Sequence, residues 1–456
     1  MTVQNTALLR QLGIASASAL VISNMIGAGI WSTPGILAGQ IGSAGMILLI
    51  WAVGAVCALA GAFCYSELGV NFPSSGGEYV YLTQAYGPTW GFMTGWVSFF
   101  AGFSAPIAAA SLAFSDYLGH FHPAFALESA GPLFGSGALA FKVGIPQATA
   151  CAVIAIFTII NCLGLRLTAR VQNTLTLVKV LVILLFLAAG FAFGTGSWDN
   201  LTHPAVRTSS TPLYAQFLVS QLLVYFGYSG WNAATYIAEE LKQPARTLPY
   251  SLTYGTLLVG GLYLALNVLF IYAVPLETMK SVVAVGALAA THLFGPAMAG
   301  AFAGAMALSL LATLNAEVTI GPRVYYAMAK NGAFFSGAAK VHPRWHTPVV
   351  AILWQGLCAM VMTLTPFVDL LLYIGFLLNF FALLSVASLF MLRKRPGWRK
   401  LPVVSFAYPL IPVFFILVGV GMTIFSLTYK PVTATIAILT LAAGAAVYHF
   451  RIRRAA

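Results

Sequence analysis

The stretch SNMIGAGIWSTP, residues 23–34, lies inside an apolar segment near the N-terminus. It carries two closely spaced glycines, Gly27 and Gly29, and a proline, Pro34. A glycine in a helix interior costs roughly 1 kcal/mol relative to alanine. The stretch therefore predicts a hydrophobic helix that is broken near its middle.

The composition of the chain places this helix in a membrane. Of the 456 residues, 60% are hydrophobic and only 7% are charged, whereas globular domains average about 25% charged residues. A soluble protein of this length would lack the polar groups that cover a water-facing surface. The composition therefore indicates an all-α membrane protein with many spans and excludes a large soluble protein.

A helix needs roughly 20 apolar residues to cross a hydrocarbon core about 30 Å thick. The hydropathy pattern predicts about twelve such helices. Their expected ranges are 13–38, 43–68, 88–118, 143–163, 170–194, 212–238, 248–274, 288–318, 347–365, 367–392, 403–428 and 432–450.

The basic residues predict the orientation of these helices. With about twelve spans, both termini lie on one side of the bilayer. Most of the 22 Lys and Arg residues fall in loops on that side, whereas the opposite loops carry only Lys142, Arg207, Lys280 and Lys430. This excess marks the side of the termini as cytoplasmic. We read the net charge of +12 as a topology signal in a multi-pass protein of the inner or plasma membrane, with the lipid bilayer and not nucleic acid as its partner.

The sixth expected span, like the first, carries glycines near its middle. Its sequence VYFGYSGWNAATYIAEE, residues 224–240, places Gly227 and Gly230 in mid-span. Paired broken helices indicate a secondary-transporter site, because unwound backbone survives at membrane depth only where it lines a cavity. Free N–H groups suit a carboxylate and free carbonyls suit an ammonium, so the pair predicts a site for an α-amino acid. Close helix packing through small residues is the alternative reading of the glycines.

Four motifs resemble the amino acid–polyamine–organocation (APC) superfamily of transporters, in particular its L-type and cationic amino-acid branches and their bacterial relatives. They are IGAGIWSTP (26–34), YSELGVNFPSSGGEYVYLTQAYG (65–87), GYSGWNAATYIAEELKQPARTLP (227–249) and GPRVYYAMAKNG (321–332). The resemblance implies the LeuT-type fold, in which two units of five helices form inverted repeats. It divides the chain into a first repeat (1–194), a second, inverted repeat (195–400) and two further helices (401–456).

The resemblance also implies which residues bind substrate. The N–H groups of Gly27, Ala28 and Gly29 hold the carboxylate. Carbonyls at both breaks receive the ammonium, the Phe226 ring covers the substrate as a gate, and Asn232 braces the unwound segment. The implied substrate-binding set is Met25, Ile26, Gly27, Ala28, Gly29, Phe226, Gly227, Ser229 and Asn232.

Lys179 alone among the basic residues falls inside an expected span, about ten residues from either end. Ionisable residues at membrane depth are functional candidates. The resemblance implies that its ammonium replaces a sodium ion near carbonyls of the first helix, with Thr313 supplying a hydroxyl. Snorkelling to an interface is the alternative. Coupling to protons and strict exchange both remain open.

Glu317 follows Thr313 by four residues and so shares its helical face. It departs from the pattern of the family. Pairing with Lys179, proton movement and contact with a substrate side chain are open roles, as is a helix end in cytoplasmic water beside Arg323.

Four other carboxylates have two interpretations, a cytoplasmic gate network or a solvated, ion-paired surface: Glu67, Glu78, Glu239 and Glu240.

These observations predict a sodium-independent secondary transporter of L-amino acids, with neutral substrates favoured. Cationic amino acids or polyamines are the first alternative, and a non-transporting amino-acid sensor is the second. The chain has no GxxxxGK[ST] phosphate loop and no catalytic constellation, and we expect no enzyme activity, cofactor or metal site. Residues 119–142 contain no cysteine, so we expect no disulfide-linked heavy subunit.

Overall fold

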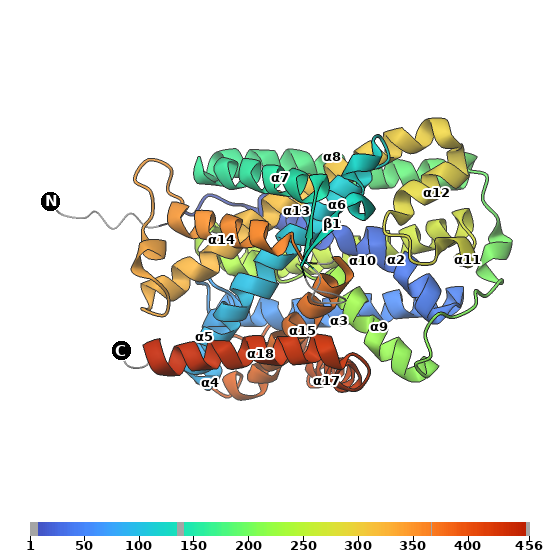
Figure 1. Ribbon diagram of the computed structural model, residues 1–456. Coiled ribbons are helices and arrows are strands. Elements are labelled where there is room, and N and C mark those ends of the chain that lie inside the picture. The colour runs from blue at the N-terminus through green and yellow to red at the C-terminus, as the bar shows by residue number, and fades with distance from the viewer. Residues whose placement is uncertain (1–7, 135–140, 366, 453–456) are drawn as a thin grey trace.

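The structure is a computed structural model that describes residues 8–134, 141–365 and 367–452 (Figure 1). In chain order the α-helices are α1 (Ile14–Met25), α2 (Ala28–Ile41), α3 (Ala44–Asn71), α4 (Glu78–Tyr86), α5 (Pro88–Val97), α6 (Ala105–Leu118), α7 (Ile145–Cys162), α8 (Leu165–Phe193), α9 (Leu213–Tyr228), α10 (Pro244–Ala273), α11 (Leu276–Met279), α12 (Val285–Phe294), α13 (Pro296–Lys330), α14 (Val349–Met362), α15 (Phe367–Leu392), α16 (Pro402–Ser405), α17 (Leu410–Tyr429) and α18 (Pro431–Val447). A π-helical segment, η1 (Ser98–Ser104), joins α5 to α6, and a 3-10 segment, η6 (Ala233–Glu240), follows α9. Two short strands, β1 (Gly131–Phe134) and β2 (Phe141–Val143), pair antiparallel.

The all-α membrane architecture is confirmed. Within the described ranges, ten helical segments are long and apolar enough to cross a membrane, and the chain is a multi-pass membrane protein. The expected count of twelve is not reached by this criterion. In the range 212–238 the chain forms the 16-residue α9 and then η6, and in the range 347–365 it forms the 14-residue α14. The helix expected at 288–318 is two helices, because the chain turns at Gly295 with φ +80° between α12 and α13.

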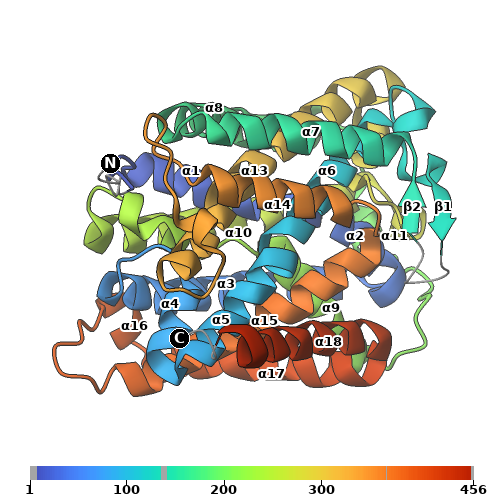
Figure 2. The ribbon, with the colours of Figure 1, turned by 60° about the vertical axis from the view of Figure 1, so that its left-hand side comes forward.

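The helices form one stack, with the first and last described residues at the same end (Figure 1). We call this the terminal end. The β1–β2 hairpin and α11 lie toward the opposite end (Figure 2). Inside the stack, α1 packs on α8, α10 and α13, while α2 packs on α9. The two segments with weakened centres are therefore neighbours in the middle of the protein.

Helix α8 shows why the stack suits a bilayer. Its outward face carries exposed leucines, including Leu177 and Leu185 at 61% and 65% exposure. Its buried face carries polar side chains at helical spacing: Thr168, Gln172, Thr176 and Lys179. Because lipid is as apolar as leucine, polar contacts inside the stack help to hold such helices together. The Thr176 hydroxyl, for example, meets the Ser23 hydroxyl of α1 at 2.6 Å.

Buried ion pairs join the helices at the terminal end. Arg323 of α13 donates to both carboxylate oxygens of Glu240 at 3.0 and 3.1 Å, and both side chains are almost fully buried. Arg393 donates in the same bidentate way to the buried Glu67 at 2.6 and 3.1 Å. A solvated surface is therefore wrong for Glu67 and Glu240, since a charge buried this deeply requires a partner.

Glu239 and Glu317 differ from the two paired carboxylates Glu67 and Glu240. Glu239 is partly exposed and lies 3.8 Å from the exposed Lys330, which fits the solvated reading. Glu317 is buried at 6% exposure, and Arg323 pairs with Glu240 instead. The interpretation of Glu317 as a helix end in water is therefore wrong.

Candidate functional site

The first helix breaks between Met25 and Ala28. Ile26 leaves the helical region with ψ 85°, and Gly27 is extended at φ −125° and ψ −156°. The Gly27 N–H donates to Met25 O at 2.9 Å, whereas the N–H groups of Ala28 and Gly29 begin a new helix and have no acceptor within it. The break thus presents the positive end of the α2 dipole at the centre of the chain's first span.

The second break follows α9. Ser229 is extended at ψ 147°, and Gly230 takes a left-handed φ of +100°, which favours glycine. The chain resumes as the 3-10 segment η6. The carbonyls that end α9 lie at the negative end of its dipole.

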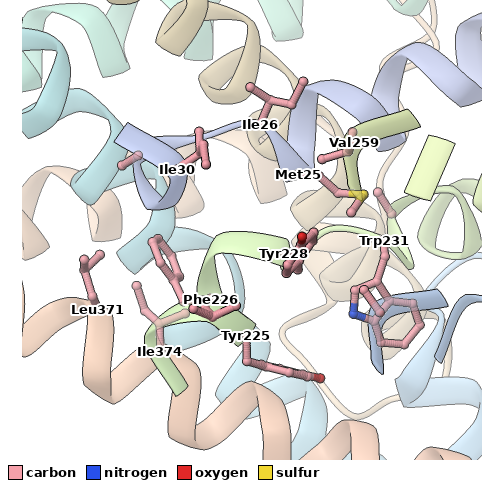
Figure 3. Close-up of a cluster of buried hydrophobic side chains, with 14 of the residues drawn as sticks. Met25, Ile26, Ile30, Tyr225, Phe226, Tyr228, Trp231, Val259, Leu371 and Ile374 are labelled. Atoms are coloured by element: carbon pink, nitrogen blue, oxygen red, sulfur yellow. The ribbon is translucent and has the colours of Figure 1, made fainter. Parts of the chain in front are cut away.

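The two breaks are in direct contact. A Cβ atom built on Gly29 would lie 2.4 Å from Gly227 Cα, and one built on Gly230 would lie 2.1 Å from Asn24 Oδ1. Figure 3 shows Met25, Phe226 and Tyr228 from the two breaks in one cluster of buried side chains, with Phe226 on the side toward Leu371 and Ile374 of α15. Glycine at these positions allows a backbone approach that a side chain would prevent.

Two adjoining cavities lie at the breaks. We call the first the break cavity; it is lined by Asn24, Met25, Gly27, Ala28, Gly29, Pro106, Ala110, Phe226, Ser229, Thr313 and Glu317. The polar lining of the second, the side cavity, includes Asn24, Glu78, Ser98, Ser229, Asn232, Tyr236 and Glu317. Asn24, Pro106, Ser229 and Glu317 line both.

The structure therefore gathers most of the implied substrate-binding set around one space. Ile26, Gly227 and Lys179 line neither of the two cavities, and Asn232 lines the side cavity. A positive helix end and a negative helix end meet at the break cavity, so it can receive a carboxylate and an ammonium at once.

Several carbonyls assigned to the ammonium already accept hydrogen bonds. Ile26 O accepts from Lys179 Nζ and from the Thr313 hydroxyl. Met25 O accepts from the Tyr263 hydroxyl and from Gly27 N–H. Phe226 O accepts one bond, from Ser229 N–H at 2.9 Å, and keeps a second lone pair. Among these carbonyls, the end of α9 thus has more free acceptor capacity than the end of α1.

Lys179 is fully buried and binds the end of α1. Its ammonium donates to Ser23 O at 3.2 Å, to Ile26 O, and to Thr313 Oγ1 at 2.8 Å. Three donors thus meet three acceptors, which satisfies the ammonium completely. Snorkelling to an interface is wrong, because a fully buried side chain cannot place its charge in water.

Glu78 is a buried carboxylate that the sequence interpretation placed in a gate or on a solvated loop. It begins α4, between the second and third spans, and is only 4% exposed. It accepts from the Tyr65 hydroxyl at 2.6 Å, from Asn232 Nδ2 at 3.2 Å and from Thr94 Oγ1 at 3.4 Å. Burial raises the pKa of Glu78 to about 7, and these hydrogen bonds only partly oppose that rise.

We expect Glu78→Gln to make stability less sensitive to pH. Since the folded pKa lies above the ordinary 4.5, the contribution of the protonated carboxyl to stability is complete below about pH 4.5 and is lost as the pH rises to about 7. Glutamine carries no charge, so its stability relative to wild type should increase over this range by roughly 3 kcal/mol. Thermal unfolding in detergent at pH 5 and pH 8 measures the difference.

The exposed Glu128→Gln is the control, because it removes a carboxylate and leaves the buried cluster around Glu78 intact. An equal stability difference between Glu78→Gln and wild type at both pH values would contradict the prediction.

Sequence reasoning missed Asn24, Pro106 and Glu78 as cavity residues. Asn24 had a usable signal, because it is a polar residue in the opening stretch immediately before the break. Glu78 is held at the cavity by Tyr65, Thr94 and Asn232, which come from three other parts of the chain. Local spacing contains no signal for such a contact.

Comparison with known proteins identifies the family of the chain. The profile of the family described as amino acid permease matches residues 12–447. The serine/threonine exchanger SteT of Bacillus subtilis is 29% identical over 98% of each chain. The large neutral amino acids transporter small subunit 2 of Mus musculus is 30% identical, over 97% of this chain and 81% of its own length. The Asc-type amino acid transporter 1 of Mus musculus is 28% identical, over 98% and 82% respectively.

These relatives are transporters and not enzymes, and each match runs over nearly the whole chain described above. The motif resemblance to the APC superfamily is confirmed. The chain therefore belongs to the amino acid permease family.

Proposed function

We propose that this protein is a sodium-independent secondary transporter of neutral L-amino acids that works by alternating access. The observation that carries the proposal is the contact between the two helix breaks, which places helix ends of opposite polarity at one cavity. Relatives named as serine/threonine, large neutral amino acid and Asc-type transporters support a neutral substrate.

In the proposed mode of binding, the N–H groups of Ala28 and Gly29 hold the substrate carboxylate. The free acceptors at the end of α9, including Phe226 O, receive the ammonium, and the Phe226 ring covers the site. Lys179 provides a fixed positive charge beside the α1 break, in place of a sodium ion. Its three hydrogen bonds to Ser23, Ile26 and Thr313 support this role.

The larger arrangement follows from the same proposal. Residues 1–194 and 195–400 form two inverted repeats, residues 401–456 add two helices, and both termini face the cytoplasm at the inner or plasma membrane. The basic loops support this orientation. We propose that the protein needs no disulfide-linked subunit, which the lack of cysteine in residues 119–142 supports.

Uptake into proteoliposomes tests the proposal. Alanine, threonine, leucine and arginine are supplied without sodium, to vesicles that are empty, preloaded with an amino acid, or held at a pH gradient. We expect uptake of neutral amino acids in sodium-free buffer. Stimulation by internal amino acid would identify exchange, and stimulation by the pH gradient would identify proton coupling.

Arginine is included because two carboxylates, Glu78 and Glu317, line the side cavity. Uptake of arginine alone would favour a cationic substrate. If no amino acid is transported, a thermal-shift assay separates binding without transport, which a sensor would show, from an absence of binding.

A further inference from the structure

Two buried polar atoms at the cavities lack partners. Glu317 Oε2 and Asn24 Nδ2 have no hydrogen-bond partner among the residues that the structure describes. Leaving a buried polar group unpaired is unfavourable, because the group has lost its hydrogen bonds to water. Both residues line both the break cavity and the side cavity, so the unpaired atoms belong to groups that a bound molecule can reach.

The positions of these residues place them beside the proposed amino-acid site. Asn24 is the penultimate residue of α1, and its amide lies against the Gly230 backbone of the second break. Glu317 follows Thr313 by one helical turn on α13, and the Thr313 hydroxyl donates to Ile26 O at the first break. Because both residues line both cavities, a substrate held at the two breaks would lie beside this pair.

The two atoms offer complementary hydrogen bonds. An amide nitrogen donates, and an ionised carboxylate oxygen accepts. A hydroxyl group can use both, because it donates one hydrogen bond and accepts others. An aliphatic side chain would leave both atoms unpaired, and a site built around polar groups rejects an analogue that lacks the matching group.

The local charge argues against a cationic side chain. Lys179 donates to Thr313 Oγ1, one helical turn from Glu317 on α13, so a basic side chain already lies near this carboxyl group. A substrate cation would have to enter a site that already holds a basic group, so it would gain less than beside an isolated carboxylate. A neutral side chain with a hydroxyl group meets the hydrogen-bonding need without adding a charge.

We propose that Asn24 and Glu317 form a subsite for a side-chain hydroxyl, so that the transporter selects serine and threonine over alanine and valine. The proposal rests on the proposed function as an amino-acid transporter. It makes both residues determinants of specificity that contact the substrate, in addition to the backbone groups that bind its carboxylate and ammonium.

The first test uses the wild-type protein in proteoliposomes. Threonine and valine differ by a hydroxyl in place of a methyl group, and serine and alanine differ by the hydroxyl alone. We expect kcat/KM to be at least about tenfold higher for threonine than for valine and for serine than for alanine. Equal values within each pair would overturn the subsite and leave amino-acid transport intact.

The second test replaces each polar atom. Glu317→Met keeps a long side chain without an acceptor, and Asn24→Leu removes the amide. In either variant we expect the threonine-to-valine ratio to fall toward one, mainly through loss of threonine transport. Ser309→Ala is the control: Ser309 is a buried, unpaired polar residue on α13 that lines neither cavity, and its loss should leave the ratio unchanged.

Other outcomes have separate meanings. A wild-type ratio that persists in Glu317→Met and Asn24→Leu would overturn the assignment to these residues. Arginine transport that is lost in Glu317→Gln would overturn the hydroxyl subsite in favour of a cationic side chain. Failure of the wild type to move any amino acid would refute the proposed function as well. If either variant fails to fold, the other variant and the wild-type comparison still decide.

Discussion

Replacing Lys179 with alanine is expected to reduce amino-acid uptake by at least about 100-fold while membrane insertion continues. The ammonium is fully buried and joins α8 to the end of α1 and to Thr313 of α13. Each hydrogen bond from a charged group contributes about 1.5–3 kcal/mol. Alanine would remove the ammonium from Ser23 O and would leave Ile26 O with only the Thr313 hydroxyl as a side-chain donor. Both carbonyls lie at the break, where the geometry of the backbone must be held for binding.

The measurement is sodium-free uptake in proteoliposomes, with size-exclusion elution in detergent as the check on folding. Thr313→Val removes one of the three acceptors and should give a smaller loss than Lys179→Ala. Lys340→Ala, in an exposed loop, is the matched control and should transport normally. Uptake by Lys179→Ala at the wild-type rate would show that the proposed fixed charge has no part in transport.

The membrane helices could be predicted well because their signal is compositional. The third expected span, 88–118, has the same limits as the segment from Pro88 to Leu118 in the structure. A turn is harder to predict where it lies inside one continuous apolar segment. The range 288–318 was predicted as one helix, although the pair Gly295–Pro296 inside it is typical of a turn and separates α12 from α13.

The two helix breaks could also be predicted, because glycine pairs recur in two apolar segments of the chain. The polar side chains could not be placed with equal success. Glu240 has Lys242 and Arg246 close to it in sequence, yet it pairs with Arg323, 83 residues away. Glu78 is likewise defined by partners from distant segments. Pairing across the chain depends on how helices meet, which local spacing does not encode.

Replacing Gly29 with valine is expected to abolish substrate binding. Even the first added atom, Cβ, would lie 2.4 Å from Gly227 Cα and 3.1 Å from Gly227 N. These are backbone atoms of α9, which cannot move aside as a flexible side chain can. The substitution would therefore separate the two breaks and disturb the N–H groups proposed to hold the carboxylate.

A matched glycine distinguishes this effect from a general loss of helix quality. Gly261 of α10 is also a glycine of a membrane-spanning helix, but a Cβ built on it meets no atom within 4 Å. We expect Gly261→Val to bind and transport nearly as the wild type does. Gly29→Ala carries the same first atom as valine and should lose binding too, although it adds the least volume.

Saturable uptake and ligand-induced thermal stabilisation measure binding in these variants. Bound ligand stabilises a folded protein by mass action, so a variant that folds but cannot bind should show a normal unfolding transition without the shift. Loss of the shift in Gly29→Val and Gly29→Ala, with its retention in Gly261→Val, would place the substrate at the contact between α2 and α9. Wild-type affinity in both Gly29 variants would instead require a binding site away from the two breaks.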